Sequence, residues 1–282
     1  MIVIHRYKAH LVAKGFHQNP RVDFFEAFSH VIKASTIRLV LSVAISKGWS
    51  LWQLDFNNAF LNGKLDEMVF MTQPPGYVNP SYPNYICKLN KVIYRLKQAS
   101  RAWNVTQTQA LLNWGFINSR SDSFLFIFWH HVSVILLLVY VDDVIVTGNN
   151  NSLVQDLITS LDKQFALKDL GCLSYFLGFQ VNYLDFGFVL NQEKYVTDLL
   201  HKLQLHDLKP TPSSNVVGKH LSALDGTPFT DPFIYRSTIG AGAVQYLTHT
   251  RPNIAYIVNH LSQFLQRPTD IHWQAVTSSS LS

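Results

Sequence analysis

The chain has 282 residues, of which 48% are hydrophobic and 15% are charged, and its formal net charge is +5. This composition excludes a disordered chain, because enough apolar side chains are present to form a core in one or two domains. The positive charge suits a polyanionic partner but is too small to identify one. Two cysteines without metal-binding spacing exclude a disulfide framework, and no signal segment or membrane span is evident, so we expect an intracellular, reducing location.

The first half of the chain alternates between helix and strand patterns. Thr36 is expected to cap a helix that Gly48 ends, because Ser and Thr favour the start of a helix and Gly favours its end. A Pro-rich connection at 74–83 separates two short strands, since proline cannot continue a strand ladder. In chain order the patterns predict the Thr36–Gly48 helix, a strand with Asp55 within 49–63, strands at 68–73 and 85–89, a helix at 98–114, and strands at 124–129, 132–141 and 144–147.

The second half becomes mainly helical. Ser152 is expected to cap a helix with an apolar face that includes Leu157 and Phe165. A hairpin turns around 185–187, and a Pro- and Ser-containing stretch at 209–232 has little periodicity, so we expect a linker there. The remaining patterns predict helices at 193–205, 237–247 and 253–266.

Two adjacent carboxylates interrupt the apolar run at 134–148. Asp142 and Asp143 are expected to form the turn of a hairpin, although Asn-Gly or Asp-Gly would suit such a turn better. Two like charges side by side repel each other unless a cation neutralises them, and Mg²⁺ prefers carboxylate oxygens. The residues alone leave two alternatives, a solvated acidic turn and a divalent-cation site.

A third carboxylate lies on another apolar strand. Alternation within the stretch 49–63 places Asp55 on the face opposite to Leu54 and Phe56. If the two strands are neighbours in one sheet, Asp55 meets the Asp142–Asp143 turn. Three carboxylates can hold two metal ions roughly 3.5 to 4 Å apart, which is the arrangement of two-metal polymerases.

An ordered set of strings resembles the reverse transcriptase of copia-type LTR retrotransposons. No single string is specific, but the order of the whole set is. The core strings are Leu-Asp-Phe-Asn-Asn-Ala-Phe-Leu at 54–61, Tyr-Arg-Leu-Lys-Gln-Ala-Ser-Arg-Ala-Trp at 94–103, Tyr-Val-Asp-Asp at 140–143 and Leu-Ser-Tyr-Phe-Leu-Gly at 173–178. Further similar strings are Tyr-Lys-Ala-His-Leu-Val-Ala-Lys-Gly-Phe at 7–16, Gln-Pro-Pro-Gly-Tyr at 73–77 and Leu-Ser-Gln-Phe at 261–264.

The resemblance implies an α+β, right-hand polymerase fold. Residues 1–190 would form the fingers and palm, an antiparallel sheet with packed helices, and 191–282 a mainly helical, partial thumb and connection region. Asp55, Asp142 and Asp143 would be the catalytic and metal-binding residues. They would hold two Mg²⁺ ions, with Mn²⁺ as an alternative. The implied partners are an RNA or DNA template-primer and dNTPs.

The resemblance also assigns a nucleotide site to Phe60, Gln98, Lys8 and His10. Phe60 matches an aromatic gate that excludes a 2′-hydroxyl group by volume, and Gln98 matches a glutamine near the incoming nucleotide. The residues alone equally allow Phe60 to be an ordinary core side chain and Gln98 to be a polar residue of the first helical turn. The family usually has Arg at the position of His10, and a partly charged imidazole would stabilise a triphosphate less.

Primer and template contacts are implied for a further set of residues. Tyr140 would support the primer terminus, and Arg101 would face template or phosphate or be a simple surface charge. Phe176, Leu177 and Gly178 resemble the primer grip, a tight hairpin, although a plain core hairpin explains them equally well.

Several features depart from the family pattern. Arg95 stands where Gly is usual, and a side chain there is strained if the backbone φ is positive. Ser100 and His30 each replace a proline. The resemblance begins after Arg6 and stops near Ala275 without an RNase H region, so we expect a truncated fragment of a pol polyprotein.

The sequence therefore predicts a reverse transcriptase domain that performs template-directed DNA synthesis from dNTPs by two-metal phosphoryl transfer. The alternative is a catalytically inactive retrotransposon remnant that at most binds nucleic acid. The two hypotheses share a fold. They differ in whether a chain with these departures from the family, at His10 and Arg95, and without the missing ends still catalyses the reaction.

Overall fold

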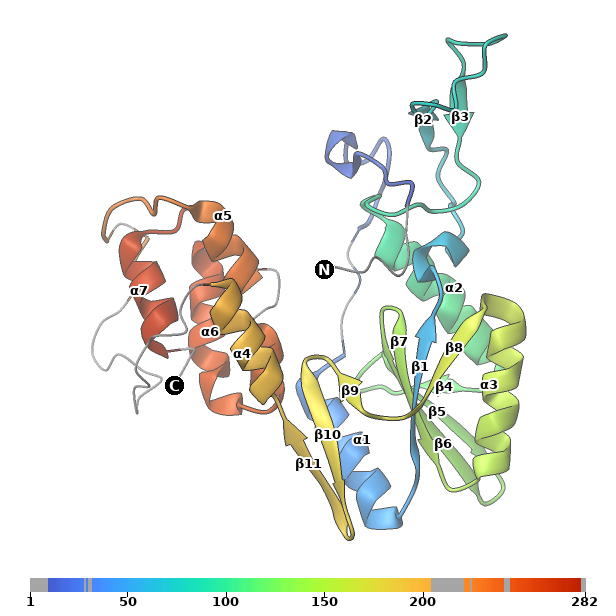
Figure 1. Cartoon of the computed structure of the whole chain (residues 1–282). Coiled ribbons are helices and arrows are strands. Elements are labelled where there is room, and N and C mark those ends of the chain that lie inside the picture. The colour runs from blue at the N-terminus through green and yellow to red at the C-terminus, as the bar shows by residue number, and fades with distance from the viewer. Residues whose placement is uncertain are drawn as a thin grey trace, which may run out of the picture. The chain divides into compact units, whose positions relative to one another are not determined.

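The computed structural model describes residues 10–27, 29, 32–203, 221–223, 225–240 and 244–279 (Figure 1). The chain divides into two compact units, Met1–Cys172 and Leu173–Ser282. This division lies before the hairpin that the sequence placed with the first part, at 1–190. Most of the expected linker at 209–232 falls outside the described residues.

Six antiparallel strands form the main sheet of the first unit. Their order is β4-β5-β6-β7-β1-β8, so β1 lies between β7 and β8 although it comes first in the chain. The expected strands around Asp55 and on both sides of the acidic pair are confirmed, whereas β4 and β8 were not predicted. The strands are β1 (Leu51–Phe56), β4 (Ile117–Asn118), β5 (Leu125–His130), β6 (Ser133–Tyr140), β7 (Asp143–Gly148) and β8 (Leu167–Cys172).

A separate pair, β2 (Phe70–Thr72) and β3 (Ile86–Lys88), brackets the Pro-rich connection, as the sequence predicts. The Gln73 side chain holds this connection together. Its amide Nε2 donates to the carbonyl oxygens of Tyr82 (2.8 Å) and Tyr85 (3.0 Å), and its Oε1 accepts from the Asn79 amide (2.7 Å). The Gln73 side chain therefore adds to the backbone turns at Pro74–Tyr77 and Asn79–Tyr82, which also order this connection.

Helix α1 (Ala34–Lys47) begins earlier than expected, because a distant carboxylate caps it. The Asp122 Oδ2 atom accepts from the Lys33 amide (2.9 Å) and from the Thr36 hydroxyl (2.7 Å). The prediction that Thr36 caps the helix is wrong, since Thr36 lies within the first turn. The prediction for Gly48 is confirmed, because it ends the helix in the left-handed conformation with φ of 65°.

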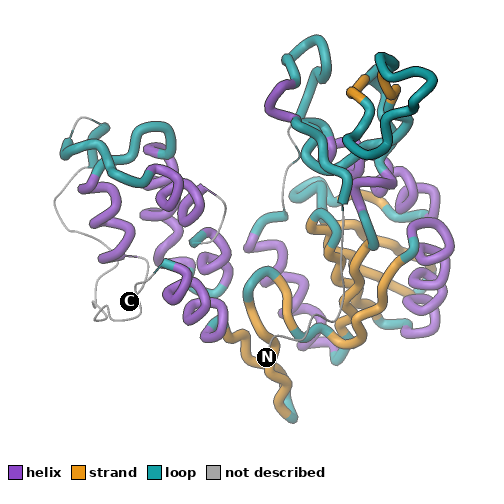
Figure 2. The backbone as a smooth tube through the Cα atoms, turned by 45° about the horizontal axis from the view of Figure 1, so that its top comes forward, coloured by secondary structure: helices purple, strands orange, loops and turns teal. Residues whose placement is uncertain are grey.

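Helices α2 (Ala99–Trp114) and α3 (Asn151–Phe165) complete the first unit. Gly115 ends α2 as expected, with φ of 106°. The cap of α3 is Asn150, whose side chain accepts from the Leu153 amide (3.1 Å), so the prediction of Ser152 is wrong by two positions. In Figure 2, α1 and α3 lie on opposite sides of the sheet.

Aromatic packing sets the face on which the carboxylates lie. Phe56 of β1, Trp103 of α2 and Phe165 of α3 contact one another, with ring centroids 5.1, 5.6 and 5.3 Å apart. Such edge-to-face pairs contribute roughly 0.5–1.5 kcal/mol each beyond burial. Because successive strand residues point to opposite faces, Asp55 lies on the face away from this cluster.

The second unit combines a small sheet with a helical core. Strands β9 (Tyr175–Phe176), β10 (Phe179–Leu184) and β11 (Gly187–Asn191) are antiparallel neighbours. A cluster of buried residues from the helices forms the core, with Tyr235 and Val258 fully enclosed. The helical elements are α4 (Glu193–Lys202), α5 (Pro232–Tyr235), a π-helical turn (Arg236–Gly240), 3₁₀ turns at Gln245–His249, Pro252–Ile254 and Ser262–Phe264, α6 (Ala255–Leu261) and α7 (Asp270–Ser279).

The expected helices at 193–205 and 253–266 correspond to α4 and to the region around α6, while α5 and α7 were not predicted. The stretch at 237–247 is π-helical and 3₁₀ where it is described. Across the described residues, none of the helices has the length and apolar character required to cross a membrane.

Candidate functional site

Four side chains form one row across the sheet of the first unit. The register pairs Tyr140 with Asp143, Asp143 with Asp55, and Asp55 with Lys168. Directly opposed residues on antiparallel strands share a face, with Cβ atoms roughly 4.5–5.5 Å apart. The prediction that Asp55 meets the acidic hairpin is therefore confirmed.

The hairpin turn differs by one residue from the prediction. Val141 and Asp142 form the turn, and Asp143 is the first residue of β7, so Asp142 and Asp143 are not the turn pair. The cause is the Tyr140–Asp143 pairing, which leaves two residues to connect the strands. Val141 has φ of 58°, a conformation that strains a β-branched residue and that hairpins usually assign to glycine.

Two hydrogen bonds hold this strained turn. The Trp103 indole Nε1–H donates to the Val141 carbonyl (2.7 Å), and the Phe56 amide donates to the Asp142 carbonyl (2.9 Å). One bond comes from α2 and the other from the end of β1. The strands that carry Asp55 and Asp143 are thereby linked to the turn that carries Asp142.

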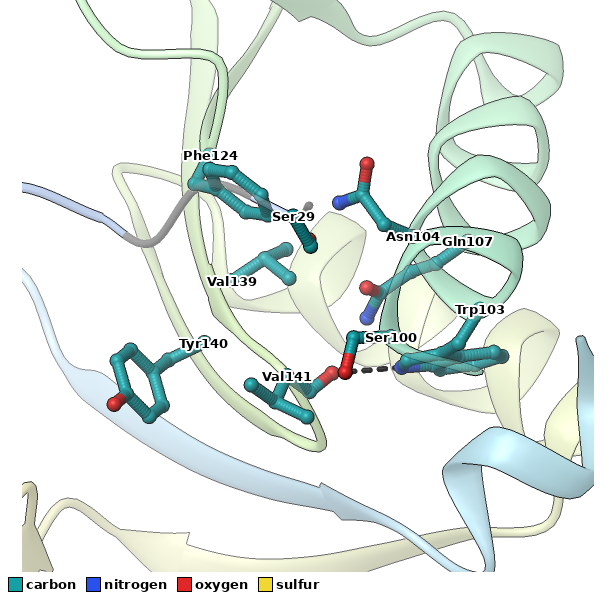
Figure 3. Close-up of a pocket in the computed structure, with 9 residues that line it drawn as sticks. All are labelled: Ser29, Ser100, Trp103, Asn104, Gln107, Phe124, Val139, Tyr140 and Val141. Carbon is teal, nitrogen blue, oxygen red and sulfur yellow. Dashed lines mark hydrogen bonds between the residues drawn. The ribbon is translucent and has the colours of Figure 1, made fainter. Parts of the chain in front are cut away.

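A cavity of about 80 Å³ lies behind the turn (Figure 3). Trp103, Ser100 and Gln107 of α2 line it together with Tyr140 and Val141. Gln107 is buried, and its Nε2 atom has no hydrogen-bond partner among the described residues. A buried amide of this kind usually binds ordered water, and the cavity is large enough to contain it.

Burial and mutual repulsion perturb the acidic residues. Burial, followed by the charges of Asp142 and Asp55, raises the pKa of Asp143 to about 6. Burial and the Asp55 charge also raise the pKa of Asp142. No ion pair joins Lys168 to Asp55 in the described structure, although the register places them opposite each other. The carboxylates therefore form an electrostatically frustrated group without a compensating cation.

Tyr94 connects this group to the expected nucleotide site, a role that the sequence did not assign. Burial and the charges of Asp142 and Asp55 raise its pKa. Its ring makes edge-to-face contacts with Phe60 (5.4 Å between centroids) and with His10 (5.1 Å). Tyr94 opens the string at 94–103, and that position was the one available signal.

Gln98 has a different environment from the one expected for a nucleotide contact. Its side chain is 1% exposed, its Oε1 accepts from Gln18 Nε2 (3.1 Å), and its Nε2 donates to the Asp23 carbonyl (3.1 Å). Both halves of the amide therefore bind the segment before α1. The structure assigns Gln98 a positioning contact, and its role toward a nucleotide stays a prediction.

The other residues assigned to nucleotide or template have different environments. Arg101 forms an ion pair with Glu26 (3.1 Å) and is partly exposed. His10 is exposed, whereas Lys8 lies outside the described residues. Their roles toward nucleotide and template stay predictions.

The expected primer-grip residues lie in the second unit. Phe176 pairs with Phe179, so Leu177 and Gly178 form a two-residue turn, and both have positive φ (47° and 80°). A Cβ atom at Gly178 would lie 3.1 Å from the Tyr195 ring. The tight hairpin is confirmed. Phe176 and Leu177 are buried, which fits a core hairpin, and their contact with primer stays a prediction.

The donor chemistry of the aspartates suits Mg²⁺, because carboxylate oxygens are its preferred protein ligands. The side chains do not converge into a closed ligand set. No group of three or more His, Cys, Asp or Glu residues within the described ranges is arranged to hold a metal ion.

Comparison with known sequences assigns the chain to a protein family. The sequence model of the family described as "Reverse transcriptase (RNA-dependent DNA polymerase)" matches residues 1–214. The chain belongs to this reverse transcriptase family. The resemblance to copia-type reverse transcriptases is thus confirmed.

The "Retrovirus-related Pol polyprotein from transposon RE1" and its RE2 counterpart, both from Arabidopsis thaliana, are 46% and 45% identical over 273 residues, 97% of this chain. The corresponding polyprotein from transposon TNT 1-94 of Nicotiana tabacum is 35% identical over 281 residues, 96% of this chain. The chain spans 18%, 19% and 21% of the lengths of these three polyproteins. No solved structure matches it.

The Trp103 bond gives a first prediction. Trp103→Phe keeps an aromatic ring but leaves the Val141 carbonyl without its donor, so the free energy of unfolding should fall by about 1–3 kcal/mol. Urea unfolding measures this change. Trp114→Phe in the same helix is the matched control, since Trp114 makes ring contacts and no hydrogen bond in the described structure. Equal losses in both variants would contradict the assigned clamp.

A second prediction follows from the raised pKa of Asp143. The folded chain binds this proton more tightly than the unfolded chain, so stability falls as pH rises from about 4 through about 6. Without divalent cations, the free energy of unfolding of Asp143→Asn should exceed that of the parent at pH 7 by about 1–2 kcal/mol, after allowance for partial exposure. Near pH 4 the two free energies should be equal. Urea unfolding at several pH values tests this. Asp156→Asn on the exposed side of α3 is the control, and a pH-independent difference for Asp143→Asn would refute the account.

Proposed function

We propose that the chain is the catalytic part of an RNA-directed DNA polymerase, which extends a primer on an RNA or DNA template from dNTPs. The observation that supports this most is the register of Asp55 opposite Asp143, next to the turn that carries Asp142. Family membership supplies the reaction class. Following the resemblance, we assign 1–190 to the fingers and palm and 191–282 to a partial thumb and connection region of a right-hand fold.

Asp55, Asp142 and Asp143 would hold two Mg²⁺ ions, or Mn²⁺ in their place. Bound there, the ions would lower the pKa of the primer 3′-hydroxyl and neutralise charge on the attacked α-phosphate. The protein's own contribution is to fix the carboxylates before the ions bind. The Trp103 and Phe56 hydrogen bonds hold the turn, and the strand register holds the other two aspartates.

The nucleotide would lie beside the rings of Phe60, Tyr94 and His10. Phe60 is partly buried and is fixed by its edge-to-face contact with Tyr94, so its volume is available to exclude a 2′-hydroxyl group. His10 and Lys8 would approach the triphosphate. Tyr140, in register with Asp143, would contact the primer terminus, and Phe176, Leu177 and Gly178 would grip the primer strand.

The second candidate is an inactive remnant that retains the fold. The open arrangement of the carboxylates and the enclosed Gln98 amide favour it. The two candidates make opposite predictions for nucleotide incorporation. A polymerase incorporates dNTPs, whereas a remnant is well folded and incorporates none.

Primer extension on an RNA template with Mg²⁺ or Mn²⁺ tests the proposal. We expect incorporation by the parent chain and a loss of at least about 100-fold on Asp142→Asn with Asp143→Asn, because metal charge stabilisation is worth several kcal/mol. Asp156→Asn with Asp162→Asn on α3 removes the same charge away from the row and should retain activity. Activity that survives the first pair would refute the metal site, and inactivity of a well-folded parent would favour the remnant.

Sugar selection gives a further prediction. Phe60→Val should raise ribonucleotide incorporation relative to deoxyribonucleotide incorporation, because the smaller side chain leaves room for a 2′-hydroxyl group. Single-nucleotide extension with matched rNTP and dNTP measures the ratio of kcat/KM values. Phe56→Leu, in the apolar cluster on the other face, should leave the ratio unchanged. An unaltered ratio in Phe60→Val would place Phe60 in the core alone.

A further inference from the structure

We propose that the cavity behind the Val141–Asp142 turn binds a small, neutral organic molecule that carries a hydrogen-bond acceptor beside an apolar group. This cavity lies between α2 and β6, and Figure 3 shows its walls. None of the three aspartates lines it in the described structure. The inference therefore goes beyond the proposed polymerase activity, and binding can be measured without catalysis.

Gln107 is a polar residue on the buried face of α2. It lies one turn from Trp103 and one turn from Leu111, and all three are buried. Its side chain is 2% exposed, and its Nε2 atom has no hydrogen-bond partner among the described residues. In Figure 3 the amide points from α2 into the cavity, toward Val139. Because a buried, unpaired amide is unfavourable, this donor requires an acceptor that the described protein does not supply.

The wall across from this amide is apolar. Phe124, just before β5, and Val139 of β6 are both buried, and the Val139 amide already donates to the Phe124 carbonyl (3.0 Å). The Trp103 indole N–H is likewise occupied by the Val141 carbonyl. A buried water needs two to four polar partners, and an apolar group that displaces a poorly ordered water gains affinity. A molecule with one acceptor and an apolar body therefore suits this cavity better than water alone.

Charge and volume restrict the molecule further. None of the described lining residues is acidic or basic, so a charged molecule would be buried without a partner. This excludes metal ions and nucleotides as occupants. The volume of about 80 Å³ is several times the roughly 10–15 Å³ that one water requires, and about half of the roughly 150 Å³ of a cavity that binds benzene. The expected occupant is therefore smaller than benzene.

The cavity is already formed and can be reached from solvent. Ser100, Asn104 and Val141 line it and are only partly buried, whereas Gln107 lies at its buried end. A small molecule can therefore enter without unfolding of the surrounding elements. The Trp103 ring also lines the cavity, so its indole N–H group should report on a molecule bound beside it.

Solution NMR of the isotope-labelled chain, with N-methylacetamide as the probe, tests the proposal. The Trp103 indole N–H signal, which Trp103→Phe identifies by its loss, should shift and saturate as the probe is added. We expect a dissociation constant of about 1–100 mM, because so small a ligand makes few contacts. Trp114 of the same helix does not line the cavity, so its signal should not shift. A Trp103 signal that does not saturate would assign the cavity to water alone and overturn the proposal.

Gln107→Leu removes the hydrogen-bond donor and keeps a side chain of similar size. We expect the dissociation constant for N-methylacetamide to rise at least about tenfold, because the acceptor of the probe loses its partner. Gln109→Leu replaces an exposed glutamine of the same helix and is the matched control, which should bind as the parent does. The other tryptophan signals show whether each variant is folded. Equal affinity of the parent and a folded Gln107→Leu chain would refute the assigned donor.

Two comparison probes test the chemistry of the occupant. Acetate is similar in size and carries acceptors, but its charge would be buried unpaired, so at equal concentration and ionic strength it should leave the Trp103 signal in place. Xenon enters apolar cavities and has no acceptor, so it should bind the parent no better than Gln107→Leu. Acetate that binds as tightly as N-methylacetamide would overturn the neutral class. Xenon that N-methylacetamide cannot displace would assign the cavity to purely apolar molecules and refute the proposal.

Discussion

Pairing between β1 and β7 brings Asp55 directly across from Asp143, and the rest of the first unit supports that register. The Phe56–Trp103–Phe165 cluster fixes β1 from the opposite face, and Trp103 also bonds the strained turn. A slip of one residue would move every side chain of β1 to the other face. Phe56 would then stand in the row of charges, so the apolar cluster specifies the position of the carboxylates.

Periodicity predicted the strands and helices that have one buried face, because burial repeats along the chain. It did not predict features that depend on distant partners. Asp122 caps α1 from the loop before β5, which no local pattern around Thr36 could reveal. Strand β8 was missed because its exposed middle residues carry no apolar alternation, and its place beside β1 is set by pairing.

The candidate site shows the same division between local and distant information. The neighbourhood of Asp55 and the acidic pair could be inferred, since both lie at the ends of apolar strands. The partners of Gln98 could not, because Gln18 lies 80 residues earlier and carries no motif that points to it. Likewise, Tyr94 was one aromatic among many until its contacts with Phe60 and His10 were known.

Strand β8 also forms one edge of the six-stranded sheet. An open edge presents unpaired backbone groups to other chains and invites edge-to-edge aggregation. Lys168 and Asp169 are exposed on this strand, and the pairing with β1 is irregular between Trp52 and Leu54. Charges and a register irregularity are features that discourage a further strand from adding. Besides lying opposite Asp55, Lys168 therefore helps to prevent this sheet edge from pairing with a strand of another molecule.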